Sequence, residues 1–497
     1  MQSQDIKPSD PKDEQVVENK ELNIWEAFIP VFALILMLFY NVFYAYGDDA
    51  LSGSNQFILL MGGAVAVIVG FFNKVSFDQM VEEVSKNIKS TAGAILILLM
   101  VGGLAGTWLI SGIIPTMIYY GMQVLNPNIF LASCVIICAV ISIATGSSWT
   151  TSATVGIALI GIANALNIPL GMTAGAILSG AYFGDKISPL SDTTNLAPAM
   201  AGTDLFTHIK YMLYTTVPTL TVALIIFVII GFNLNPTGTV ETHSMLDAVE
   251  KSINVSPWLF VVPVVVIILI IKKTSPLIAL LIGIILGGIA ALIFQPNIVA
   301  ELGGGTSLNF HTGYKGIMNA ITVDSSIPTD NEALKDLFSA SGMTGMLNTI
   351  WLIICAMTFG GIMEAIGALS TISKALLNLF HTTFGLFAST VFSCLALNVT
   401  ASDQYLAIVI PGKMYSKAFK DKGLAPENLS RTLEDSGTVT SVLVPWNTCG
   451  AYHSKVLGVD TLHYAGYAIF NWLSPFMTLL FAAFSIKIRQ LANPENQ

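Results

Sequence analysis

The stretch from Ser90 to Gly184 contains no Asp, Glu, Lys, Arg or His. A bilayer crossing needs only about 20 apolar residues, so several crossings fit into this stretch alone. The chain of 497 residues is 54% hydrophobic and 11% charged, whereas a soluble globular chain carries about 25% charged residues. Too little polar surface is available to cover such a chain in water. The sequence therefore predicts an all-α polytopic membrane protein, with the lipid bilayer as its main surroundings.

The remaining composition excludes several classes of function. Residues 1–22 are acidic and polar, which predicts a disordered cytoplasmic tail. The net charge of -9 offers no broad basic face, so nucleic acid is not an expected partner. The five cysteines lie in or beside apolar segments and suggest neither a disulfide framework nor a metal cluster. No Gly-rich loop with Lys and Ser/Thr is present, which disfavours ATP-driven transport, and no cofactor is expected.

Eight apolar segments are predicted to cross the membrane. They are residues 25–46, 57–72, 91–114, 207–232, 258–271, 277–294, 345–369 and 463–486. Two further apolar segments are interrupted by clusters of Gly, Pro, Ser, Thr, Asn and Asp; they are residues 129–205 and 383–458.

The positions of Lys and Arg predict the orientation, because these residues stay on the cytoplasmic side. Basic residues gather in the loops at 74–89 and 413–431 and near Lys272, whereas residues 47–56 and 115–128 lack them. The first group is therefore expected inside and the second outside. Both chain ends are then cytoplasmic, in the cell membrane.

Threading the chain through these constraints predicts two halves of the same construction and opposite topology. Each is expected to contain three helices, a re-entrant hairpin, a broken helix and a final helix. The first half spans 23–235, with its hairpin at 129–168 and its broken helix at 170–204; a linker follows at 236–256. The second half spans 257–490, with an external loop at 295–343, a hairpin at 383–412 and a broken helix at 431–458.

Weak sequence symmetry favours this inverted repeat. Gly102 to Leu104 recurs as Gly360 to Ile362, the tip beginning at Thr145 recurs at Thr400, and Pro189 matches Pro445. The three separations are 258, 255 and 256 residues. Each short match means little alone, but three in order at nearly one spacing indicate an internal repeat.

Four polar clusters carry the candidate chemistry. Irregular backbone at membrane depth survives only where protein or water satisfies it, and in repeat transporters the ion and substrate bind there. Carboxylate, hydroxyl and carbonyl oxygens are also the ligands that hard cations prefer. The candidate ion- or substrate-binding residues are Thr145, Ser147 and Ser148 in the first tip; Asp185, Asp192, Thr193, Thr194 and Asn195 around Pro189; Asn398, Thr400, Ser402 and Asp403 in the second tip; and Asn447 and Thr448 beside Pro445.

Within this set, Na+ is expected at Asp192 and its neighbouring oxygens. The proton-coupling candidates are Glu364, Asp403, Asp192 and Asp435. Glu364 lies in an otherwise apolar segment, where a lone carboxyl must be protonated or paired.

Structural alternatives stand beside each of these assignments. The hydroxyls of the tips could bond back to helix carbonyls. Asp185 and Lys186 could form a surface pair, Asp403 could cap a helix, and Glu434 and Asp435 could do the same after their basic loop.

At these residues the sequence resembles the NhaC-type Na+/H+ antiporter family, which also includes malate/lactate antiporters. The resemblance rests on residues 145–149, on the run from Gly184 to Asn195, and on the pairing of 434–438 with 445–450. It implies a member of the broader ion-transporter superfamily, with paired re-entrant hairpins and an elevator-like or rocking cycle. Transporters of this kind are often homodimers.

The leading hypothesis is a secondary active transporter that exchanges Na+ for H+, the two competing for one carboxylate site. The alternative is a cation-coupled exchanger or symporter of a small organic anion of the malate/lactate type, or of an amino acid. A channel and an intramembrane enzyme are less favoured readings, and no nucleophile with a paired base supports an enzyme.

Overall fold

The computed structural model describes residues 22–46, 53–124, 126–234, 239–272, 274–329, 335, 338–378 and 382–491. The elements up to residue 201 are α1 (Ile24–Tyr40), η1 (Asn41–Tyr46), α2 (Ser54–Phe72), α3 (Phe77–Ser90), α4 (Ala92–Ile110), α5 (Ile113–Val124), η3 (Pro127–Ile129), α6 (Phe130–Thr145), α7 (Ser148–Thr151), η4 (Ser152–Gly156), α8 (Ile157–Ala165), α9 (Leu170–Ile187) and α10 (Asp192–Ala201). 

The elements that follow are α11 (Leu205–Asn233), α12 (Thr239–Ser252), η5 (Pro257–Phe260), α13 (Val261–Ile271), α14 (Pro276–Phe294), α15 (Pro296–Leu302), α16 (Phe310–Thr322), β1 (Ser325–Ser326), β2 (Ser339–Ala340), η6 (Thr344–Met346), α18 (Leu347–Ala365), α19 (Ala368–Asn378), α20 (Thr383–Thr400), α21 (Leu406–Asp421), α22 (Pro426–Leu433), η7 (Glu434–Thr438), η8 (Ser441–Leu443), α23 (Thr448–Leu457), α24 (Thr461–Ala465) and α25 (Ile469–Ala483).

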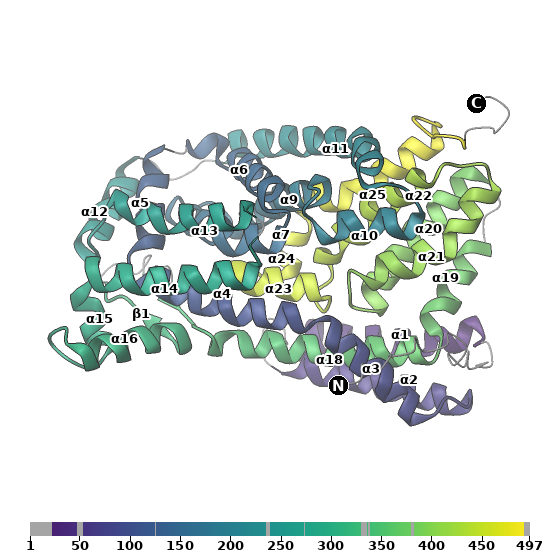
Figure 1. Ribbon diagram of the computed structural model, residues 1–497, viewed down its shortest axis with the longest axis horizontal. Coiled ribbons are helices and arrows are strands. Elements are labelled where there is room, and N and C mark those ends of the chain that lie inside the picture. Colours follow the sequence, from purple (N-terminus) through teal and green to yellow (C-terminus); the bar gives the residue numbers. More distant parts are fainter. Residues whose placement is uncertain are drawn as a thin grey trace, which may run out of the picture.

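Long apolar helices dominate this architecture. Within the described ranges, eight helices are long and apolar enough to cross a membrane, and a bent pair, Leu246–Ser252 with Pro257–Ile270, would make a ninth. Several of these helices lie side by side along the longest axis, with the short segments α7, α10 and α23 between them (Figure 1). The prediction of an all-α polytopic membrane protein is confirmed, while the inverted relation of its halves stays a prediction.

Close packing of α6 against α9 folds the first interrupted segment back on itself. A Cβ on Gly180 would lie 2.2 Å from the carbonyl oxygen of Val135, and one on Gly184 would lie 2.5 Å from the amide nitrogen of Ile143. Small residues let membrane helices approach this closely. Later positions of α9 meet later positions of α6, so the two helices run parallel. The chain between them, α7 to α8, must therefore return to the level at which α6 begins.

The two helix breaks are built from the same parts. In the first half the side chain of Ser191 caps α10, and Gly202 ends that helix in the left-handed conformation with a φ of 84°. In the second half Asn447 caps α23, and Gly458 ends it with a φ of 66°. Both pairs are separated by 256 residues, the separation of Pro189 and Pro445. Hydroxyl or amide caps and a terminal glycine explain why each short helix begins and ends where it does.

The segment expected as an external loop, residues 295–343, contains short helices and a strand pair. It contains α15, α16 and the antiparallel pair β1 and β2. Asn309 and Thr312 form a capping box at the start of α16, and Ala320 packs against Gly106 of α4. Short helices and a strand pair can form a connection between crossings, so the external position of this segment stays a prediction.

Other predicted segments fall partly beyond the described ranges. The predicted tail, residues 1–22, lies outside the described residues except for Leu22, as do residues 47–52 of the expected outer loop and 236–238 of the linker. The rest of that linker is largely the helix α12.

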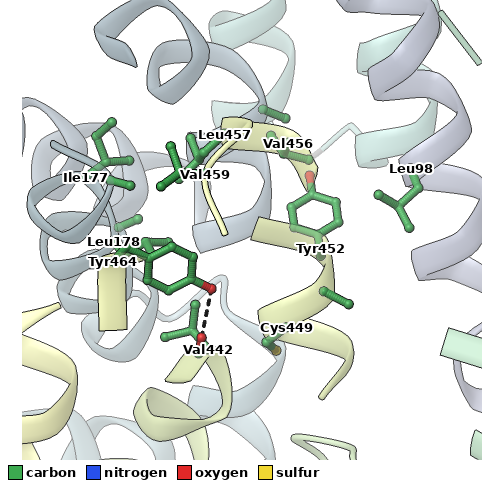
Figure 2. Close-up of a cluster of buried hydrophobic side chains, with 14 of the residues drawn as sticks. Leu98, Ile177, Leu178, Val442, Cys449, Tyr452, Val456, Leu457, Val459 and Tyr464 are labelled. Carbon is green, nitrogen blue, oxygen red and sulfur yellow. Dashed lines mark hydrogen bonds between the residues drawn. The ribbon is translucent and has the colours of Figure 1, made fainter. Parts of the chain in front are cut away.

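Buried side chains hold the second break in place. Tyr464 of α24 donates a hydrogen bond of 2.9 Å to the carbonyl oxygen of Val442 in η8. Figure 2 shows this contact beside Cys449 and Tyr452 of α23, with Leu178 of α9 packed nearby. The contact explains how the irregular chain between η7 and α23 keeps a fixed course.

Candidate functional site

Asp185 is the deepest of the carboxylates predicted around Pro189. It stands near the end of α9 and is buried. Its Oδ2 accepts hydrogen bonds from the amide of Ser148, at 3.2 Å, and from the hydroxyl of Ser148, at 2.6 Å. The structure therefore brings together the first tip and the first break.

The other polar residues of the first break satisfy the backbone around Pro189. The hydroxyl of Thr194 donates to the carbonyl oxygens of Asp185 and Lys186, both at 2.9 Å. The amide of Asn195 donates to the carbonyl oxygens of Pro189, at 3.0 Å, and Ser191, at 2.7 Å. Thr193 lies with its hydroxyl 3.1 Å from that of Ser191. The contacts of Thr194 and Asn195 supply hydrogen-bond donors to carbonyl groups that lack an intrahelical partner where the helix is broken.

Asp192, the expected centre of the sodium site, has a different environment. It is the first residue of α10 and its side chain is exposed. The hydroxyl of Tyr405, from the segment between α20 and α21, lies 3.5 Å from its Oδ2. Asp192 therefore meets the second half of the chain, but at an exposed edge of the site.

Lys186 pairs with Asp435 in the second half, so the alternative of a surface pair with Asp185 is wrong. Both side chains are fully buried. Hydroxyl groups complete the pair: Ser474 lies 3.1 Å from Lys186 Nζ and 3.1 Å from Asp435 Oδ1, and Thr215 and Thr478 donate to Asp435 Oδ2 at 2.9 and 2.5 Å. A buried ion pair is tolerated where hydrogen bonds satisfy its remaining groups, as they do here.

The second tip is bound to the second break in the same manner. The side-chain amide of Asn398 donates to the carbonyl oxygen of Gly437, at 2.8 Å, and the backbone carbonyl oxygen of Asn398 accepts from the side-chain amide of Asn447, at 3.0 Å. The amide of Thr448 donates to the carbonyl oxygen of Ser402, at 3.0 Å. Ser402 is buried with a φ of 59°, an uncommon conformation that these contacts stabilise.

Several predicted ligands make local contacts of the structural kind. Ser147 caps α7 by accepting from the amide of Thr150, at 3.1 Å. Thr145 has only long contacts, including one of 3.5 Å to the hydroxyl of Thr151. Thr400 bonds back to the carbonyl oxygen of Ala396, at 2.8 Å.

Asp403 takes the capping geometry that the sequence left open. Its carboxylate accepts a hydrogen bond from the backbone amide of Leu406, at 3.0 Å, and Leu406 is the first residue of α21. It is nevertheless buried. The cap therefore does not by itself decide its role.

Glu364 does not lie well inside an apolar helix as expected. It is the penultimate residue of α18 and is half-buried. The charged helix α3 packs along α18. The apolar run continues past Glu364 in the sequence, but the helix ends at Ala365, which is why the expectation failed.

Sequence reasoning missed three residues that the fold brings to these clusters. Lys186 was considered only as a partner of its neighbour Asp185, Tyr405 was given no role, and Glu434 was considered as a helix cap. Glu434 is fully buried. Its signal was the segment 434–438, in which every residue except Gly437 is polar and which is π-helical in the structure; π-helical turns frequently mark functional sites.

Aromatic contacts join the two halves beside the polar clusters. The rings of Trp149 in α7 and Tyr452 in α23 stack with centroids 3.9 Å apart. The hydroxyl of Tyr452 also donates to the carbonyl oxygen of Trp149, at 3.0 Å. Among the described residues, no three His, Cys, Asp or Glu side chains gather as ligands of a metal ion.

Broken apolar helices that bring buried carboxylates and hydroxyls together define an integral membrane transporter. Comparison with known proteins identifies the family. The model of the Na+/H+ antiporter family matches residues 180–486. The chain belongs to this family.

Similarity to individual relatives extends over most of the chain. It is 36% identical to the Na+/H+ antiporter NhaC of Alkalihalophilus pseudofirmus, covering 86% of this chain and 90% of the relative. It is 34% identical to the malate-2H+/Na+-lactate antiporter of Bacillus subtilis, covering 87% and 88%. It is 31% identical to the arginine/ornithine antiporter ArcD of Halobacterium salinarum, covering 93% and 92%.

Proposed function

We propose that this protein is a secondary active transporter that exchanges Na+ for H+ across the cell membrane. The observation that carries the proposal is Asp185, a buried carboxylate that accepts two hydrogen bonds from the tip residue Ser148 in a member of the Na+/H+ antiporter family. A buried carboxylate needs a proton or a cation when its charge is not otherwise compensated. When Na+ and H+ compete for such a group, binding of one requires release of the other, and this coupling is sufficient for exchange.

The cation site that we propose lies between the two breaks. Asp185 supplies a buried carboxylate and Asp192 an exposed one, with oxygens of both tips around them. Among the predicted proton carriers, Asp435 already has Lys186 and three hydroxyls as partners. We therefore favour Asp185 and Asp192, and not Asp435, as the carboxylates at which Na+ and H+ compete.

Substitution of each carboxylate by an amide tests this site. Asp185→Asn and Asp192→Asn should each abolish Na+-dependent proton movement in proteoliposomes that contain a pH-sensitive dye, because the amide keeps the shape of the side chain but removes its charge. Glu301→Gln, at an exposed position on α15, is the control and should exchange like the wild type. Unchanged exchange by either aspartate variant would remove that residue from the site.

A second candidate function is coupled transport of a small carboxylate or amino acid. The observation in its favour is that relatives of similar identity are named as malate/lactate and arginine/ornithine antiporters. Labelled malate, lactate or arginine would be offered to proteoliposomes under an imposed Na+ gradient. Uptake that requires Na+ would favour this second function, and proton movement without any organic uptake would favour pure cation exchange.

We also propose the membrane arrangement predicted from charge, with inverted halves and both chain ends in the cytoplasm. Support comes from exposed lysines such as Lys74, Lys417 and Lys420. Arg431, counted among the basic loop residues, gives no such support because its side chain is fully buried. A homodimer is the assembly that we expect for this kind of transporter, and blue native electrophoresis of the purified protein would test it.

A further inference from the structure

Glu434 is a buried carboxylate that the site described so far does not use. It begins the π-helical segment η7 and has no exposed surface. Neither of its carboxylate oxygens accepts a hydrogen bond within the described part of the chain. Burying a charged group without a partner is costly, so a carboxylate in this setting has to be neutralised by a proton or a cation.

Backbone carbonyl groups near Glu434 have hydrogen-bond donors, whereas its own carboxylate has none among the described residues. Side chains supply donors to the carbonyl groups of η7: Thr440 to Ser436 at 2.5 Å, Asn398 to Gly437 at 2.8 Å, and Gln404 and Ser441 to Thr438 at 2.9 and 2.7 Å. Irregular backbone inside an apolar protein is normally satisfied in this way. Among the side chains of η7, the carboxylate of Glu434 and the hydroxyls of Ser436 and Thr438 have no hydrogen-bond partner in the described structure.

The neighbouring cations do not provide a hydrogen-bonded partner. Lys186 is bound to Asp435 and Ser474. Arg431, one turn before Glu434, is fully buried, and none of its three guanidinium nitrogens donates a hydrogen bond in the described structure. Its guanidinium instead lies 4.5 Å from the centre of the Tyr211 ring.

Two oxygen-bearing groups lie close to the carboxylate. Thr438 follows Glu434 by four residues in η7, and its buried hydroxyl, like the carboxylate, has no hydrogen-bond partner in the described structure. Asp185 of the first half precedes Lys186, whose ammonium group pairs with Asp435, the residue after Glu434, so this ion pair brings Asp185 and Glu434 into the same region. Oxygen atoms of carboxylates and hydroxyls are the ligands that a hard cation such as Na+ selects.

We propose that Glu434 is a ligand of the transported Na+, with the Thr438 hydroxyl beside it, so that the second half contributes a charged ligand to the site formed by Asp185. This inference rests on the proposed function, since it names a residue of the same site. A bound cation would supply the partner that the carboxylate of Glu434 lacks.

The test measures Na+ affinity in the full-length protein. Binding of Na+ to the purified protein is followed by titration calorimetry against choline, and the KM for Na+ is measured in proteoliposomes. Glu434→Gln should raise both the dissociation constant and the KM about tenfold or more, because a charged ligand is lost. Thr438→Val should raise them by a smaller factor, whereas removing a hydroxyl that binds nothing would be neutral.

Glu427→Gln is the matched control. Glu427 is a buried carboxylate on α22, seven residues before Glu434, but it is paired with Arg489 at 2.8 Å. Its substitution should leave the affinity for Na+ unchanged. If Glu434→Gln does not fold, Glu434→Asp, which keeps the charge but withdraws the oxygens, carries the test together with Thr438→Val.

Two results would overturn the inference while leaving the proposed function intact. One is a wild-type affinity for Na+ in Glu434→Gln. The other is restored affinity in the double variant Arg431→Gln with Glu434→Gln, which would make Glu434 a structural partner of Arg431. A wild-type protein that binds Na+ but drives no proton movement would instead contradict the proposed function, because the calorimetric result does not depend on transport.

Discussion

Asp435 and Glu434 are adjacent in the sequence, yet the fold treats their carboxylates differently. Asp435 is compensated by Lys186 and by three hydroxyl groups, whereas Glu434 accepts no hydrogen bond among the described residues. Consecutive side chains on a helix point in different directions, so each meets a different part of the surrounding protein. A polar motif therefore does not assign a role to each of its members.

Lys186→Met tests whether the buried ion pair of Lys186 and Asp435 stabilises the contact between the two halves. Removing one partner of a buried ion pair leaves the other charge uncompensated, which costs about 3 to 5 kcal/mol. We expect a marked fall in the thermal unfolding temperature in detergent. The double variant Lys186→Met with Asp435→Leu should recover much of the loss, and equal stability of the single variant and the wild type would refute the role.

At the scale of the element, helices and breaks were the most predictable features. The apolar runs predicted the crossings, and Pro189 and Pro445 with their flanking polar residues predicted where helices end. The partners of side chains were not predictable, because Lys186 and Asp435 lie 249 residues apart in the sequence. The side chain of Asp192 is exposed because of how α10 packs against the rest of the fold. The ten residues of α10 are too few for hydrophobic periodicity to predict this exposure.

The contact between α6 and α9 gives a prediction at this scale. Gly180→Ala places a methyl group 2.2 Å from a backbone oxygen that has no free rotamer with which to move aside. Overpacking of this kind costs about 1 to 3 kcal/mol. Gly93→Ala is the control, because a Cβ there meets no atom within 4 Å. Chemical denaturation should show a loss for the first variant and not for the second, and equal stabilities would mean that the helices separate easily.

At the scale of the whole molecule, contacts between the halves converge on the polar clusters. The Lys186 pair, the stack of Trp149 on Tyr452, and the approach of Tyr405 to Asp192 all join the first half to the second. An ion bound among them would be sensitive to the position of both halves. Such a site suits alternating access, in which the two halves move relative to each other around a bound ion.

The central claim is that one cation site is built jointly by the two halves. The most direct measurement is a structure determined in the presence of Na+ at a resolution that shows the ion. The account predicts an ion in contact with the carboxylates of Asp185 and Glu434. An ion held by residues of one half alone, away from both carboxylates, would contradict it.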